Sequence, residues 1–65
     1  MNRFTLRDMS LITWYEQRMI IKDSDGHTLA EISNSQTRSE VYKPLLDRWV
    51  QSIGAIDDTL IVKVI

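Results

Sequence analysis

The chain has 65 residues, no cysteine, and eight Lys and Arg against nine Asp and Glu, which gives a formal net charge of −1. This length predicts a single domain over residues 1–65, and the lack of cysteine excludes a disulfide framework and a thiolate metal site. A small domain without disulfides favours a reducing compartment, so we expect a cytoplasmic protein. No apolar run approaches the ~18 residues of a membrane span, and the first residues lack the apolar stretch of a signal peptide.

The first third of the chain predicts two strands. Residues 2–7 alternate between two sides, as in a short half-buried strand that carries Phe4 on its apolar side. Residues 12–22 predict the longest strand, because Ile, Thr, Trp and Tyr favour extended backbone. A helical turn over residues 10–17, capped by Ser10, is the alternative interpretation.

The strongest local signal is the turn at residues 23–26. Asp23 suits the start of a type I turn, and Gly26 supplies a left-handed residue. We therefore expect a hairpin that pairs residues 17–23 with residues 27–33. The implied register places these residues opposite each other: Ile21 and Leu29, Ile20 and Ala30, and Arg18 and Ile32.

A polar loop over residues 33–38 precedes the predicted main helix, residues 39–53. Its apolar residues cover about half of a helical wheel. Pro44 lacks an N–H, so regular helix is expected from about residue 43, and Gly54 is the natural residue to follow the helix. A final strand is predicted over residues 59–65.

The expected fold is α+β, with a three- to four-stranded, mainly antiparallel sheet in the order β-β-β-α-β and one amphipathic helix packed on one face. Its expected core consists of Phe4, Leu45, Leu46, Trp49, Ile53, Leu60, Val62 and Val64. The order hairpin–helix–strand is similar in topology to small regulatory proteins, among them phage-encoded inhibitors of host enzymes. No residue motif accompanies that similarity, so it transfers no functional residue.

The sequence contains only weak matches to motifs for metal binding, phosphate binding or catalysis. Residues 23–26 match the middle of a calcium-binding loop, but Ile21 and Ile32 stand at its first and last ligand positions. His27 is expected on the surface beside the turn. The chain has only two glycines and no Gly-rich phosphate loop. A chain this small rarely forms a catalytic cleft, so we expect a non-enzyme without metal or cofactor.

Function is predicted from the two-sided apolar pattern of the sheet. One helix covers one face, and an apolar second face marks an interaction site. The candidate residues for a protein or dimer interface are Trp14, Ile20, Ile32, Ile61 and Ile65. The last strand, with Lys63 as its only charge, would pair with another chain if it lies at an edge; the alternative is a central, buried strand.

The leading hypothesis is a protein-binding regulator or inhibitor that docks on a larger protein, as phage- or mobile-element-encoded inhibitors do, with a homodimer as a further form. The alternative is a nucleic-acid-binding protein that uses the outer sheet face. Its candidate residues are Arg3, Arg7, Arg18 and Lys22. The slightly acidic net charge argues against this alternative.

Overall fold

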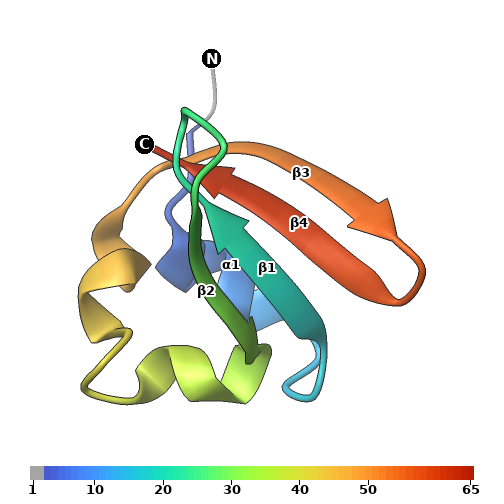
Figure 1. The fold of residues 1–65 in the computed structure, drawn as a ribbon. Coiled ribbons are helices and arrows are strands. Elements are labelled where there is room, and N and C mark those ends of the chain that lie inside the picture. Colours follow the sequence, from blue (N-terminus) through green and yellow to red (C-terminus); the bar gives the residue numbers. More distant parts are fainter. Residues whose placement is uncertain (1–2) are drawn as a thin grey trace.

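The computed structural model describes residues 3–65 and shows one four-stranded sheet with helical segments on one side (Figure 1). The elements in chain order are α1 (Leu6–Ile12), β1 (Arg18–Lys22), β2 (Thr28–Ser33), the 3₁₀ segments η1 (Asn34–Arg38) and η2 (Lys43–Asp47), β3 (Val50–Ile56) and β4 (Thr59–Val64). The strand order in the sheet is β2-β1-β4-β3. The α+β class is therefore confirmed.

The sheet is mixed, so the mainly antiparallel arrangement and the predicted order of elements are wrong. β1 pairs with β2, and β3 pairs with β4, as antiparallel hairpins, but the two central strands β1 and β4 run parallel. A parallel pair needs a long crossover connection, which η1, η2 and β3 provide here. The last strand is confirmed over Thr59–Val64. It is central, as the alternative interpretation has it, so the edge position that would let it pair with another chain is wrong.

The predicted strand over residues 2–7 is replaced by the start of α1; Asn2 lies outside the described residues. The Thr5 hydroxyl accepts the Asp8 N–H at 3.2 Å, and the Asp8 carboxylate accepts the Thr5 N–H at 3.1 Å. This reciprocal capping box satisfies free N–H groups of the first helical turn. It outweighs the two-residue alternation, and only a single bridge from Thr5 to Trp49 is strand-like.

The predicted long strand over residues 12–22 is wrong in its first half, because β1 begins only at Arg18. The alternative, a helical turn over residues 10–17, places the helix about one turn too late. Thr5, not Ser10, caps α1. The aromatic residues that suggested a strand lie instead in the loop between α1 and β1.

The hairpin turn is confirmed, with Gly26 at φ +90°. Lys22 lies opposite Thr28, as the predicted register requires, but a bulge between Ile21 and Lys22 then shifts the pairing by one residue. The one-residue shift moves every remaining side chain of β2 to the other face of the sheet, because neighbouring residues of a strand point to opposite faces. Ile32 thus lies on the buried face opposite Met19, and the prediction of Ile32 as an interface residue is wrong.

The predicted helix over residues 39–53 does not form. Pro44 lies in the first turn of η2, where its missing N–H is tolerated, and this 3₁₀ segment ends at Asp47. The β-branched residues that follow form β3, and Gly54 lies in the middle of that strand. The apolar residues of 39–53 cover half of a helical wheel, but this pattern did not discriminate between a helix and a strand.

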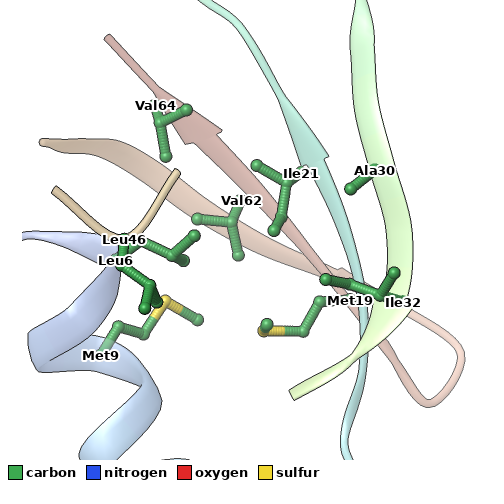
Figure 2. Packing of buried hydrophobic residues seen from close by; sticks show 9 residues of the cluster. All are labelled: Leu6, Met9, Met19, Ile21, Ala30, Ile32, Leu46, Val62 and Val64. Atoms are coloured by element: carbon green, nitrogen blue, oxygen red, sulfur yellow. The ribbon is translucent and has the colours of Figure 1, made fainter. Parts of the chain in front are cut away.

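The core lies between one face of the sheet and the helical layer (Figure 2). Its buried residues are Leu6, Met9, Met19, Ile21, Ala30, Ile32, Leu46, Val62 and Val64. Leu46, Val62 and Val64 were correctly predicted, and Leu45 and Leu60 are partly buried against them. Three predicted core residues are exposed instead: Phe4 (37%), which depended on the missing strand over residues 2–7, and Trp49 (43%) and Ile53 (47%), which depended on the missing helix.

Candidate interaction surfaces

The first candidate surface lies at the end of α1 and in the loop after it; we call it the aromatic loop. Four large apolar residues form it, with exposed fractions of 68% for Leu11, 86% for Ile12, 61% for Trp14 and 56% for Tyr15. The buried side of α1 carries Leu6, Met9 and Ser10, so Leu11 and Ile12 lie off the core-facing stripe. The rings of Trp14 and Tyr15 pack with centroids 4.5 Å apart.

Hydrogen bonds from η1 hold the backbone of the aromatic loop in place. The buried Asn34 side chain donates through Nδ2 to the Thr13 carbonyl at 2.9 Å and to the Ser10 carbonyl at 3.0 Å. The Ser35 N–H donates to the Tyr15 carbonyl at 2.8 Å. The Asn34 bonds satisfy carbonyls that the end of a short helix leaves free, and the Ser35 bond holds the loop that follows. The exposed aromatic side chains therefore project from a fixed backbone.

The second candidate surface is a hollow of about 390 Å³ beside the start of β3; we call it the edge hollow. The residues that line it are Arg3, Phe4, Trp49, Val50, Gln51, Ser52, Ile53 and Ile65. Two backbone hydrogen bonds of 2.9 Å assemble it: Val50 N–H donates to the Phe4 carbonyl, and Ile65 N–H donates to the Trp49 carbonyl. Both ends of the described chain therefore meet at this point of the sheet.

β3 itself is an edge strand, and a β-bulge between Val50 and Ser52 disturbs its first end. It has seven residues, none of them charged and none of them proline, and all except Val50 are exposed. Within residues 3–65, the only neighbour on its outer side is Phe4 at the first position, and nothing pairs there with residues 51–56. Natural edge strands usually carry charges, proline or bulges that oppose pairing with another chain. β3 has only the bulge at its first end, and residues 52–56 contain no charge, proline or register shift.

The outer face of the sheet mixes apolar and basic residues. Ile20 and Ile61 lie side by side on β1 and β4, both half-buried. Lys22 lies beside Lys63 in the same register, and Arg18 is two residues from Ile20 on the same face. Glu31 faces Ile20 from β2. This face contains no aromatic residue in its strands, in contrast to the prediction that Trp14 would join it.

The predicted site residues do not gather in one patch. Trp14 belongs to the aromatic loop, Ile65 lines the edge hollow, and only Ile20 and Ile61 are neighbours; their part in binding stays a prediction. Of the basic candidates, Arg18 and Lys22 share the outer face, and the other two lie elsewhere. Arg3 lines the edge hollow, and the Arg7 guanidinium binds the Asp47 carboxylate at 3.0 Å on the helical side.

Sequence reasoning missed Leu11, Ile12 and Tyr15, as well as the exposed part of β3. A usable signal was present for the first group. Thr5 and Asp8 have capping-box spacing, which would have started a helix at Leu6 and left Leu11 and Ile12 off its buried side. β3 carried no comparable signal, because its exposure depends on how far the helical layer reaches.

The turn between β1 and β2 gathers Asp23, Asp25 and His27, whose potential ligand atoms lie within 4.8 Å of one another. The Asp23 carboxylate has a structural task there: it accepts the His27 N–H at 2.9 Å and the Asp25 N–H at 3.0 Å. The His27 backbone bond is the main cause that lowers the pKa of Asp23 below its ordinary value. The turn therefore accounts for the position of the Asp23 carboxylate.

No family model, curated protein or solved structure matches the chain. None of the helices within residues 3–65 has both the length and the apolar character needed to cross a membrane.

Proposed function

We propose that this protein is a small non-enzymatic regulator or inhibitor that acts in the cytoplasm by docking the aromatic loop on a larger protein. The observation that carries the proposal is a group of four large apolar side chains, each more than half exposed, within residues 11–15. Exposed aromatic and aliphatic side chains on a soluble domain mark interaction sites.

The fixed backbone of the aromatic loop supports this role. Asn34 and Ser35 donate hydrogen bonds to its backbone carbonyls. The backbone of the loop therefore loses little conformational entropy when a partner buries Trp14 and Tyr15. Trp and Tyr anchors commonly dominate the binding energy of protein interfaces. A partner with an apolar pocket wide enough for a tilted aromatic pair fits this surface.

The edge hollow supports binding better than catalysis. Its lining among residues 3–65 contains apolar side chains, two neutral polar side chains and that of Arg3, but no carboxylate or imidazole side chain that could act as a general acid or base.

The proposal is tested by affinity capture from nuclease-treated lysate of the source cells, followed by reconstitution with the purified captured protein. Wild type, a Trp14→Ala/Tyr15→Ala variant and a Val41→Ala control are compared; Val41 is 77% exposed but lies outside the aromatic loop. We expect one stoichiometric partner that binds wild type and the control and is lost with the double variant. Equal binding by the double variant would refute the aromatic loop as the docking site.

The second candidate function is nucleic-acid binding by the outer sheet face. The adjacent Lys22 and Lys63, with Arg18 on the same face, are the observation that favours it. A binder of this kind loses affinity steeply as salt rises, in proportion to the phosphates neutralised. Titration of single-stranded and duplex oligonucleotides at several salt concentrations, with Lys22→Glu/Lys63→Glu as the variant, tests it; absence of binding at low salt excludes it.

A further inference from the structure

We propose that two copies of this chain pair along β3 in antiparallel orientation, about a two-fold axis at Gly54, to form one continuous eight-stranded sheet. This inference does not depend on the proposed function, because it concerns β3 and the edge hollow instead of the aromatic loop. It rests on four observations: the free edge, the complementary ends of that edge, the available register and the glycine at its centre.

The free edge is suited to pairing because it is uncharged and, within residues 3–65, no other strand pairs with residues 51–56. Extended backbone presents N–H and C=O groups along this side, and another strand satisfies them. The other edge of the sheet, β2, carries Glu31 near its middle. The difference in charge selects β3 as the pairing edge.

The two ends of the β3 edge complement each other. The first end has the apolar edge hollow with Arg3 in its lining, and the second end has Ile56, which is 66% exposed, followed by Asp57 and Asp58 in the turn. An antiparallel two-fold brings the first end of one copy to the second end of the other. An apolar side chain then meets an apolar hollow, and carboxylates meet a guanidinium. Such self-complementarity is what an isologous dimer requires.

The register follows from the neighbours of β3. Val50 N–H is already bonded to the Phe4 carbonyl, and a bulge lies between Val50 and Ser52, so the regular segment available for pairing is residues 52–56. A two-fold axis perpendicular to the sheet places one residue opposite its own copy, and Gly54 is the middle of residues 52–56. Ile53 then lies opposite Ala55 of the second copy, and Ser52, on the rim of the hollow, lies opposite Ile56 of the second copy.

Gly54 has no explanation within one copy. Its φ is not in the left-handed region, and a Cβ built on it meets nothing within 4 Å. A glycine inside a strand weakens it, and it often marks a place where another backbone approaches closely. At the centre of the proposed dimer, Gly54 faces Gly54 of the second copy across the axis.

The first experiment uses cysteine cross-linking, since the chain has no native cysteine. Residues opposite each other in an antiparallel pair have Cα atoms about 4.5–5.5 Å apart, within the range that a disulfide spans. We expect Gly54→Cys to form a covalent dimer under mild oxidation, much faster than Ser24→Cys, an exposed control in the β1–β2 turn. Adding Ile53→Lys, which places a charge on the edge, should return the Gly54→Cys rate to that of the control.

Charge exchange tests the ends of the edge. In the Gly54→Cys background, two copies that both carry Arg3→Asp bring negative charges together at both ends of the dimer. Two copies that both carry Asp58→Arg bring positive charges together at the same places. A mixture of the two variants restores opposite charges at both ends. We therefore expect each variant alone to cross-link slowly and the mixture to cross-link at least as fast as the parent, with heterodimers as the main product.

Sedimentation equilibrium of the wild-type chain provides the measurement that involves no substitution. We expect a concentration-dependent rise from the 7.6 kDa monomer toward twice that mass, absent in Ile53→Lys, with unchanged far-ultraviolet circular dichroism. A monomer at every concentration, together with Gly54→Cys cross-linking no faster than Ser24→Cys, would overturn the proposal. Self-association that Ile53→Lys leaves unchanged would also overturn it, because another face would then form the dimer.

Discussion

The two edge strands of the sheet, β2 and β3, differ in what protects them. β2 alternates buried and exposed residues, carries Glu31, and continues directly into η1. β3 is longer, uncharged and exposed on nearly every residue, and its turn with β4 projects beyond the helical layer (Figure 1). A core of this size covers three strands of the sheet. The fourth strand is held mainly by pairing with β4, which leaves it available to another chain.

The largest expected effect is the difference in stability loss between a substitution in a covered strand and one in β3. Ile21 is fully buried, so Ile21→Ala should lower the free energy of unfolding by about 2–5 kcal/mol. A domain of this size has a total of roughly 3–5 kcal/mol, so this variant should be largely unfolded. Ile53→Ala, at a site 47% exposed, should cost less than about 1 kcal/mol in dilute solution. Urea denaturation of both variants measures the difference, and equal losses would show that β3 belongs to the core.

The next effect concerns the link between the helical layer and the aromatic loop. Asn34→Ala removes the Nδ2 donor from buried carbonyls at the end of α1, which should cost about 1–3 kcal/mol. Asn34→Asp has nearly the same shape but cannot donate, so it should not restore stability. The exposed neighbour Ser35 provides the control, since Ser35→Ala keeps the backbone bond to Tyr15. Urea midpoints of the three variants decide the point; full stability of Asn34→Asp would contradict this role.

A smaller effect is expected where α1 meets the start of β3. Thr5 caps α1 and also bridges to Trp49, so Thr5→Ala should cost about 1 kcal/mol. Thr5→Ser retains the capping oxygen and should keep most of the stability. Thermal unfolding of both variants measures this, and equal losses would assign the effect to the Thr5 methyl group instead of the cap.

The smallest effect is the pH dependence of the β1–β2 turn, a feature of the protected side of the sheet. Asp23 has a lowered pKa because its carboxylate accepts the His27 and Asp25 N–H groups. The stabilisation is therefore complete above the ordinary aspartate pKa of about 3.9 and is lost as the pH falls through the lower, folded-state value. Asp23→Asn should weaken this acid-induced loss, whereas Asp25→Asn should retain it. Urea midpoints measured from neutral to acidic pH compare the variants.

Local signals predicted the parts of the fold that local interactions determine. The turn at Asp23–Gly26 fixed the first hairpin, and the β-branched run of residues 59–64 gave the last strand. The bulge beside Ile21 could not be seen in this pattern, and it alone moved Ile32 from a predicted interface into the core. The parallel pairing of β1 with β4 depends on contacts about 40 residues apart in sequence, which neither periodicity nor turn chemistry encodes.

The candidate site was predicted only in part for a related reason. Trp14 was chosen as an aromatic residue and Ile65 from the alternation of the last strand, and both are exposed. The surfaces to which they belong depend on tertiary packing: Asn34 fixes the aromatic loop, and the limited reach of the helical layer opens β3. Exposure of an apolar residue is a property of the assembled layers and not of its own segment.

The central position of β4 also has a consequence during synthesis on the ribosome. β1 and β2 leave the exit tunnel first and can close as a hairpin, but the other side of β1 stays open until residues 59–64 emerge. Until then Met19 and Ile21 have no Leu60 or Val62 beside them. The sheet is completed only by β4, the last of its four strands in chain order, so Met19 and Ile21 on the nascent chain stay accessible to chaperones until β4 emerges.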